Sequence, residues 1–460
     1  MKDDRDESKY RWEDQVASWH GVPVSRRQVI RGGLILGAGV VASPLLAACG
    51  TSTATTASQF KGLGHFITNV TSLISGNRGF RFGLEQLGET FTEQSYDGDP
   101  QKAISQAELF GSIGVKGVTS YLVSDALLTP YGQSLGRQGI AYFNYANRVP
   151  WRSPLEPGFK GFFVAHSNGS FAEESYLVCK ALFAKAGGQG EVLHFTGVPG
   201  DASDTARTYG VKLALREFPN IRIVGGQPTN WDRVKAQTAT EALLPAHPNV
   251  RIIVGQNDSI ALGCLASVRA ARKTGVFISG VDADPEWLQA MTTDERAVVT
   301  AAGRLDHTGV LAAVRIYDYI HGVKYNPLES MLNTDSIMVD TPTSAQAMLD
   351  LIGAAPGPLP YNVKKMSRYL QGDHWEYNHR VTVADPTNFD WGSKPGVNPT
   401  PRPADFQWPD GYQAALDSGA LDKLNADYDS KLRDVYGPVR AKANFKGSGV
   451  IGIFKQIGIA

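Results

Sequence analysis

The sequence predicts an α/β protein built from two doubly wound parallel-sheet lobes, and two features support that prediction. Short apolar runs, such as residues 252–254 and 276–278, alternate with segments whose apolar residues recur at the spacing of about 3.6 residues typical of a one-faced helix. Runs that are apolar throughout suit parallel strands covered by helices on both faces. The chain has 460 residues, enough for two or three domains.

In the first part of this region the predicted elements alternate regularly. Strands are expected at residues 62–68, 90–96, 118–123 and 140–145, with helices at 77–87 and 101–114. Repeated strand–helix units call for parallel strands joined by crossover helices. The segment from Gly132 to Gly136 fits the G-x-S-x-G pattern of a hydrolase nucleophile, but no strand precedes it, so we interpret the match as chance.

A second set of units begins with the apolar residues 162–164. Further strands are expected at residues 191–195, 221–224, 252–254, 276–278, 298–301 and 335–339, and helices at 175–186, 232–244, 261–271, from Pro285 onward and at 308–320. Asp258 and Asp284 each precede a helix, so we expect both to be N-cap residues. Asn257 and Asp282 have no such role and follow neighbouring strands, where open α/β sheets bind small molecules.

Residues 251–287 carry the most specific pattern in the chain. They run strand, Gln256-Asn257-Asp258, an Ala-Leu-Gly helix, a second strand and then Asp282. This order resembles type I periplasmic solute-binding proteins of the ribose-binding kind. The resemblance extends from Gly62 to about Asp340, and it implies two lobes joined by three crossings near residues 164–168, 301–304 and 332–336. It also implies a ligand held in the cleft between the lobes.

The resemblance implies a set of ligand contacts. They are Asn69, Asn147, Arg148, either Arg207 or Tyr209, Trp231, Asn257, Asp282 and Arg304. Trp231 matches an aromatic residue that lies flat against a sugar ring, whose C–H face is apolar. Two positions depart from the family: Asn147 replaces an aspartate before Arg148, and Gly303 or Arg304 replaces a glutamine.

Each of these contacts has a simpler alternative. Asn257 and Asp282 could be ordinary polar loop residues. Arg148 could be a surface ion-pair residue, and Trp231 could be a hydrophobic staple for the helix that follows it.

The amino terminus contains two targeting patterns in sequence. Arg26 and Arg27 precede a weakly apolar, glycine-containing run that ends at Ala48, which resembles a twin-arginine export signal. Residues 46–49 (Leu-Ala-Ala-Cys) resemble a lipobox, in which Cys49 is lipidated and becomes the first mature residue. Glycines and Pro44 in the run disfavour a buried or membrane-spanning helix.

Composition excludes several classes of function. The chain has 45 basic and 45 acidic residues without a basic block, which argues against a nucleic-acid partner. No standard zinc spacing occurs, and we expect neither a metal nor a cofactor. Cys179 and Cys264 fall within helical patterns and are expected to be small core residues rather than a disulfide pair. After residue 340, stretches rich in Pro and Gly predict an irregular extension with one amphipathic helix at 421–435.

Together these features predict a division of the chain. We expect an export signal with lipobox at 1–49, a tether at 50–60, an N-terminal lobe from 61–165 with 303–332, a C-terminal lobe from 166–302 with 333–340, and an extension at 341–460. The expected function is that of a monomeric, lipid-anchored solute-binding protein outside the cytoplasmic membrane. It would capture a sugar or sugar-like polyol between its lobes, without catalytic residues, and deliver it to the permease of an ABC importer.

Two other functions stay open at this point. The same fold could serve as the ligand receptor of a membrane sensor. An enzyme acting on glycosides could instead recruit two carboxylates such as Asp258 and Asp282.

Overall fold

The computed structural model describes residues 59–66, 70–146, 151–353, 358–384, 404, 406–447 and 449–458, which fall within one compact unit. Six residues with predicted roles lie outside these ranges: Arg26, Arg27, Cys49, Asn69, Asn147 and Arg148. Within the described ranges, no helix combines the length and apolar character needed to cross a membrane.

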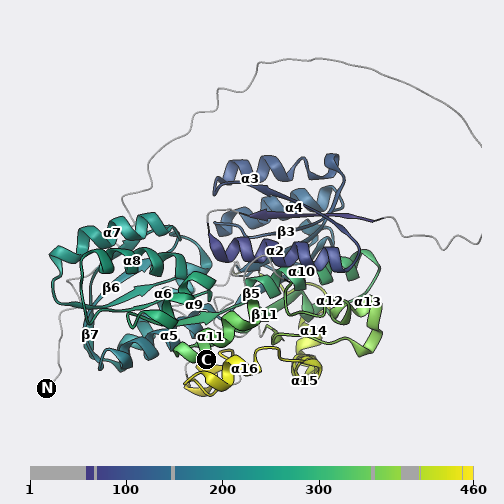
Figure 1. Ribbon diagram of the computed structural model, residues 1–460. Helices are drawn as coiled ribbons and strands as arrows, with labels where there is room; N and C mark the ends of the chain where they lie inside the picture. Colours follow the sequence, from purple (N-terminus) through teal and green to yellow (C-terminus); the bar gives the residue numbers. More distant parts are fainter. Residues whose placement is uncertain are drawn as a thin grey trace, which may run out of the picture. The chain divides into compact units, whose positions relative to one another are not determined.

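The first sheet has seven strands in the order β13-β11-β5-β4-β3-β1-β2 (Figure 1). Its strands are β1 (Lys61–Phe66), β2 (Thr90–Ser95), β3 (Val115–Ser120), β4 (Ala141–Ala146), β5 (Phe163–Gly169), β11 (Met331–Thr334) and β13 (Val381–Val383). All pair in parallel except β13, which is antiparallel to β11. Every residue of the central strand β4 is buried, as expected for a parallel sheet covered on both faces.

Helices cover both faces of this sheet (Figure 1). They are α2 (Thr71–Gln86), α3 (Pro100–Ala107), α4 (Leu128–Arg137) and α10 (Leu305–Ile320). Glycines bring α2 and α10 into backbone contact: a Cβ atom at Gly79 would lie 1.9 Å from the carbonyl oxygen of Asp306, and one at Gly309 would lie 2.1 Å from that of Gly76. This packing holds the start of α10, and with it a crossing between the lobes, against the first lobe. Ser134 is buried inside α4, so the G-x-S-x-G match is not a nucleophile elbow.

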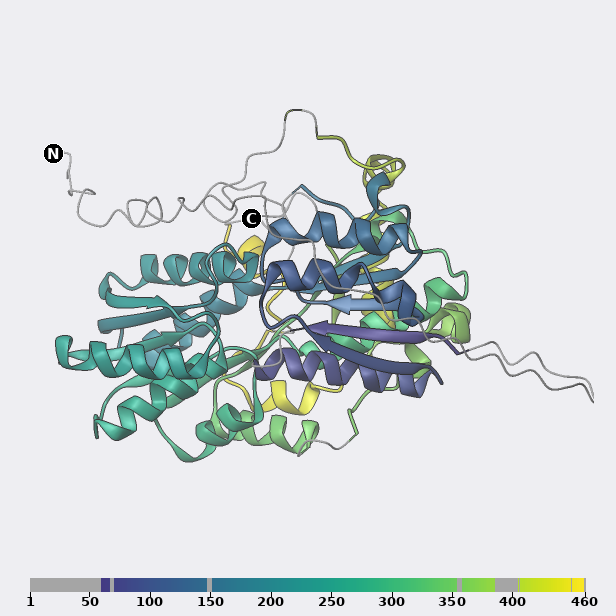
Figure 2. The same ribbon diagram turned by 90° about the horizontal axis from the view of Figure 1, so that it is seen from above.

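The second sheet has six strands in the order β12-β10-β9-β8-β6-β7. Its strands are β6 (Gln189–Thr196), β7 (Asn220–Pro228), β8 (Val250–Gly255), β9 (Phe277–Ser279), β10 (Ala297–Ala302) and β12 (Ile337–Val339), and only β12 is antiparallel to its neighbour. Its helices are α5 (Phe171–Lys185), α6 (Ala202–Glu217), α7 (Arg233–Ala246), α8 (Asp258–Ala270) and α9 (Pro285–Thr293). Figure 2 shows the teal strands of this sheet between helices on either face. Cys179 and Cys264 are buried in this lobe as unpaired thiols.

The chain passes between the two sheets three times, after β5, between β10 and α10, and between β11 and β12. The first crossing comes after Gly169, later than the predicted 164–168, because β5 continues in register beside β4 and β11. The other two fall at residues 303–304 and 335–336. The fold class is therefore the predicted one, with two parallel-dominated sheets and alternating helices.

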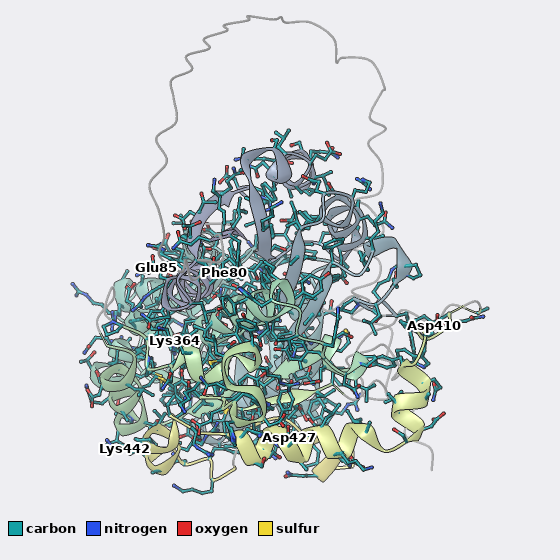
Figure 3. All side chains as sticks on the ribbon, turned by 90° about the vertical axis from the view of Figure 1, so that its right-hand side faces the viewer. Phe80, Glu85, Lys364, Asp410, Asp427 and Lys442 are labelled. Carbon is teal, nitrogen blue, oxygen red and sulfur yellow. The ribbon has the colours of Figure 1, made fainter. Side chains whose placement is uncertain are left out.

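The extension is more regular than predicted. It contains α11 (Pro342–Ile352), α12 (Val363–Met366), α13 (Arg368–Gln371), β13, α14 (Tyr412–Asp417), α15 (Ala420–Lys431), α16 (Gly437–Lys442) and α17 (Ile453–Gln456). Figure 3 looks onto this part of the chain, with Asp427 and Lys442 labelled on its yellow helices. The helix predicted at 421–435 is present as α15, which ends at Lys431. For the other elements the predicted irregular structure is wrong, because short helices and a three-residue strand leave too little periodicity to read from sequence.

The extension binds the chain at its crossings through buried carboxylates. One carboxylate oxygen of Asp335, between β11 and β12, accepts hydrogen bonds from the backbone of Val450 at 2.8 Å and Ile451 at 3.1 Å. Glu173, at the start of α5, accepts from the backbone of Gly452 and Phe454, both at 3.0 Å. These contacts fix the end of the chain to the segments that connect the lobes.

The extension also encloses His307, near the start of α10. Its ring lies edge-on to Tyr361 at 5.1 Å and to His379 at 5.3 Å. Neither ring nitrogen has a hydrogen-bond partner among the described residues, and the side chain has no exposed surface. Burial lowers the pKa of His307 to about 4, while Asp306 raises it and Arg304 lowers it further. The imidazole is therefore neutral in the folded protein.

His307→Phe should make stability less sensitive to acid. An unfolded histidine has a pKa of about 6.5, so the unfolded chain binds a proton that folded His307 does not, and stability is lost as pH falls from 6.5 toward 4. Phenylalanine keeps the edge-on ring contacts but cannot bind a proton. The variant should therefore lose about 2–3 kcal/mol less stability than the wild type as pH falls from 6.5 toward 4. Urea unfolding at pH 7 and pH 4.5 measures the difference. The pKa values of His65 and His194 are also lowered to about 4. Both proteins should therefore still lose some stability as the pH falls. Equal losses of stability in wild type and variant would contradict the prediction.

Candidate functional site

A cavity lies where loops from both sheets meet. The first lobe contributes Val70, Ser72, Leu73, Tyr121 and Ala146, the second Phe171, Ser203, Arg207, Trp231, Asn257 and Asp282, and the start of α10 adds Leu305. Many of these residues follow the carboxyl ends of strands, the position at which open α/β sheets bind ligands. The structure thus brings together four of the predicted ligand residues: Arg207, Trp231, Asn257 and Asp282.

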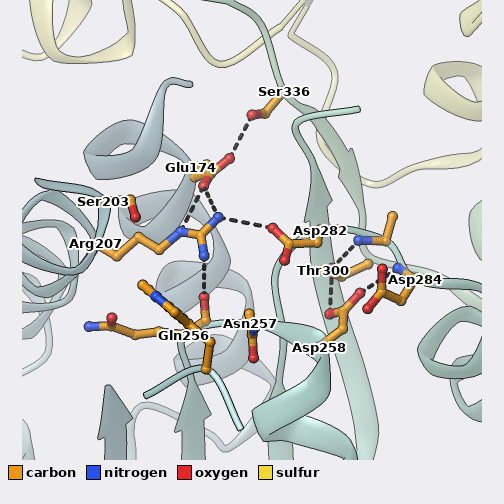
Figure 4. A network of polar contacts seen from close by, with 12 residues as sticks. Glu174, Ser203, Arg207, Gln256, Asn257, Asp258, Asp282, Asp284, Thr300 and Ser336 are labelled. Atoms are coloured by element: carbon orange, nitrogen blue, oxygen red, sulfur yellow. Dashed lines mark hydrogen bonds and ion pairs between the residues drawn. The ribbon is translucent and has the colours of Figure 1, made fainter. Parts of the chain in front are cut away.

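Arg207 is the centre of the polar network beside this cavity (Figure 4). It lies in α6, whose first turn is capped by Asp201 through the backbone of Ser203 at 2.7 Å. Its guanidinium donates to Glu174 at 3.2 Å, to the carbonyl oxygen of Gln256 at 2.7 Å and to Asp282 at 3.0 Å. A buried cation is stable only when it is paired and hydrogen-bonded, and this one is.

The carboxylates around Arg207 are buried as deeply as the arginine. Burial raises the pKa of Glu174, and Arg207 opposes that shift. Burial likewise raises the pKa of Asp282, and Arg207 and a hydrogen bond from Ser72 oppose it. Burial by itself would lower the pKa of Arg207, but Asp282 and Glu174 raise it overall, so the guanidinium stays charged. The pocket therefore presents fixed donors and acceptors in a site of low polarity.

Aromatic rings form the apolar wall of the cavity. The Arg207 guanidinium carbon lies 5.0 Å from the ring centre of Phe171 and 5.5 Å from that of Trp231. The indole of Trp231 is held by a 3.3 Å hydrogen bond from its nitrogen to Asp201. It lies so close to residue 197 that a Cβ atom there would be 2.0 Å from the ring, which only glycine avoids. A rigid aromatic surface of this kind can cover the C–H face of a sugar.

Two of the residues that line the cavity have unusual backbone angles. Trp231 has φ of +63° and Asp282 has φ of +114°, both in the left-handed half of conformational space. Non-glycine residues rarely adopt such angles, and they concentrate at ligand sites where the surrounding structure enforces them. Here the backbone of Asp282 is fixed by a 2.8 Å hydrogen bond to Ala301.

Tyr121 connects the lobes at the edge of the cavity. It follows β3 in the first lobe, and its hydroxyl donates to the carboxylate of Asp201 in the second lobe. Asp201 thereby accepts from Tyr121 and Trp231 as well as from its own helix. Burial, and then Asp201, raise the pKa of Tyr121 well above its usual value, so it remains a donor. Sequence reasoning missed this pair, because the predicted strand at 118–123 placed Tyr121 inside the strand, whereas β3 ends at Ser120.

The capping roles predicted around α8 are reversed in the structure. Asn257 is the N-cap, and its side chain accepts from the backbone of Ile260 at 2.8 Å while it also lines the cavity. Asp258 is the first helical residue, and its carboxylate accepts from the backbone of Asp284 at 2.7 Å and from Thr300 at 2.9 Å. Asn and Asp cap equally well, so their order alone does not reveal which one takes the extended backbone. Asp284 does occupy the N-cap position of α9, but its side chain makes no capping bond in the described structure.

Two predicted ligand residues lie outside the cavity. Tyr209 packs against Phe454 of the extension, with ring centres 6.4 Å apart, so Arg207 rather than Tyr209 faces the site. Arg304 pairs with Asp306, packs over the ring of Tyr436 and lines a neighbouring cavity instead. The reason is the same for both: the extension provides partners that the resembled family gave no ground to expect.

Comparisons with known proteins agree with this geometry. The family model described as "Periplasmic binding protein domain" matches residues 75–315. The D-allose-binding periplasmic protein of Escherichia coli (strain K12) is 26% identical over 213 residues, which cover 46% of this chain and 68% of that protein. The xylitol-binding protein of Mycolicibacterium smegmatis is 25% identical over 266 residues, covering 57% of this chain and 73% of that protein.

Solved structures show the same fold. A periplasmic solute-binding protein of an ABC transporter from Actinobacillus succinogenes 130z, with bound D-allose, superposes with a TM-score of 0.57 at 20% identity and covers 63% of this chain and 100% of that one. A twin-arginine translocation pathway signal protein from Burkholderia phytofirmans has a TM-score of 0.61 at 18% identity, with 66% and 100% covered. The relatives are substrate-binding transport proteins rather than enzymes, which argues against the glycoside-processing alternative. Because the family model spans more than half of the chain, the protein belongs to the periplasmic binding protein domain family.

Proposed function

We propose that this protein is the extracytoplasmic solute-binding component of an ABC importer and that its ligand is a sugar or sugar-like polyol. The cavity between the lobes carries this proposal, because it combines an aromatic wall at Trp231 with the buried pair of Arg207 and Asp282. Charged donors and acceptors make strong hydrogen bonds to hydroxyls, and the indole covers the apolar face of a ring. Relatives named for D-allose, ribose, D-apiose and xylitol support this class of ligand.

Capture follows from the placement of the contacts. Arg207, Trp231, Asn257 and Asp282 come from the second lobe, whereas Tyr121 and Ser72 come from the first. We propose that Asn69, Asn147 and Arg148 complete the first lobe's contribution. A ligand that touches both lobes binds the closed arrangement more tightly than the open one and so shifts the equilibrium toward closure. The closed form is then the one offered to an importer permease.

A thermal-shift screen tests the proposed ligand class. Pentoses, hexoses, xylitol and nucleosides are added singly to the purified protein, and its melting temperature is recorded. A sugar or polyol present at a hundred times its dissociation constant should add about 2.7 kcal/mol of stability and raise the melting temperature. Stabilisation by nucleosides alone, with every sugar and polyol inert, would overturn the proposal.

We further propose that the protein is exported by the twin-arginine route and anchored through a lipid on Cys49, which would keep it beside its permease. Cys49→Ser should therefore move the exported protein from the membrane fraction to the soluble one, while the buried Cys179→Ser should not. Fractionation after a carbonate wash measures this, and a Cys49→Ser protein that stays in the membrane would refute the anchor. Arg26→Lys with Arg27→Lys should leave precursor in the cytoplasm.

A further inference from the structure

A second cavity adjoins the first. Ser72, Asp282 and Leu305 line both cavities. These three residues therefore lie between the two spaces. Ser72 belongs to the first lobe and Asp282 to the second, so opening of the lobes parts them and joins the two spaces.

Asp284 is the polar group in the second cavity that lacks a partner. Its side chain is 5% exposed and lines the cavity, and no described residue hydrogen-bonds or forms an ion pair with its carboxyl group. Figure 4 shows it beside Asp258, which is already satisfied by the Asp284 backbone and by Thr300. A carboxyl group in a buried position is stabilised by hydrogen-bond donors, and the hydroxyls of a bound molecule can supply them.

Arg304 also lines this cavity, and its guanidinium pairs with Asp306. The lining therefore places a carboxyl group at Asp284 and a guanidinium group at Arg304. With Asp282, Asp284 and Asp306 all present, the cavity suits neutral hydroxyls better than an anion. Burial and Asp282 raise the pKa of Asp284 well above its usual value, and a protonated carboxyl can both donate to and accept from hydroxyls.

We propose that the second cavity is a further subsite of the ligand site and that the ligand is a disaccharide or similar glycoside. One ring lies against Trp231 in the first cavity, and the second ring places its hydroxyls at Asp284 and Arg304. The linkage between the rings passes between Ser72 and Asp282, which line both cavities. This inference rests on the proposed function, since it divides one sugar site into two parts.

Calorimetric titration of the purified protein with matched sugars tests the subsite. The probes are D-glucose, D-galactose, D-allose and D-ribose, together with maltose, cellobiose, lactose and melibiose. At least one disaccharide should bind about tenfold more tightly than either of its component sugars. Asp284→Ala should reduce this disaccharide advantage at least fivefold. Asp284→Asn, which keeps the helix N-cap type, should also reduce it and serves if the alanine variant fails to fold.

Asp99→Ala is the matched control, because Asp99 caps α3 through the backbone of Gln101 and Lys102 and lines neither cavity. It should lower the melting temperature without changing the affinity ratio. If monosaccharides bind and no disaccharide binds more tightly, the subsite is refuted while the proposed function stands. If a disaccharide is preferred but the Asp284 variants keep that preference, its second ring lies elsewhere and the subsite is again refuted. If no sugar binds, both proposals fail.

Discussion

Replacing Arg207 by methionine should destabilise the folded protein by about 3–5 kcal/mol and abolish ligand binding. The substitution leaves Glu174 and Asp282 without a counter-charge, and their side chains are only 1% and 8% exposed. Without Arg207 the pKa values of both carboxyls rise further, because Arg207 is what opposes the effect of burial. A carboxyl whose pKa is raised by folding destabilises the protein as pH rises above its unfolded value. The loss should therefore be larger at pH 8 than at pH 5.

Urea unfolding at these two pH values measures the effect. Arg216→Met is the matched control. Arg216 lies on the same helix as Arg207, but it is exposed and near the other end of the helix. We expect that control to unfold close to the wild-type midpoint. An Arg207→Met protein with the wild-type midpoint at pH 8 would show that the buried network does not stabilise the fold.

Trp231→Ala should weaken sugar binding by about 2–4 kcal/mol, in line with aromatic anchors at other interfaces. Trp231 is 3% exposed and lines the cavity, so removing its indole leaves the apolar face of a ring uncovered. Trp231→Phe retains an aromatic face but loses the hydrogen bond to Asp201, and should keep most of the affinity. Calorimetric titration of the three proteins with the sugar that gives the largest thermal shift measures this. An alanine variant that binds within twofold of wild type would contradict the role of Trp231.

The sequence was sufficient to predict the two parallel sheets, because the segments that form their strands and helices have strong hydrophobic periodicity. The ribose-binding-like segment also identified Asn257 and Asp282, and both line the cavity. The sequence did not correctly predict which residue caps the helix that follows. Asn257 and Asp258 exchange the expected capping role, since two adjacent residues with similar capping preference differ only in backbone angles that tertiary structure selects.

Contacts between distant segments could not be read from the sequence. The bond from Tyr121 to Asp201 joins two lobes, and no pattern near either residue specifies it. Strand β11 is only four residues long and buries the polar residues Asn333 and Thr334. Its sequence therefore does not predict a strand, and its pairing with β5 and β13 makes it one. The same limitation explains Arg304 and Tyr209, which turn toward the extension.

A crystal structure of the protein grown with the most stabilising sugar tests the central claim most directly. We predict that the sugar lies between the lobes with one ring face against Trp231 and with its hydroxyls within hydrogen-bond distance of Arg207, Asn257 or Asp282. A sugar bound at any other place, with the cavity beside Arg207 and Trp231 free of it, would contradict this account.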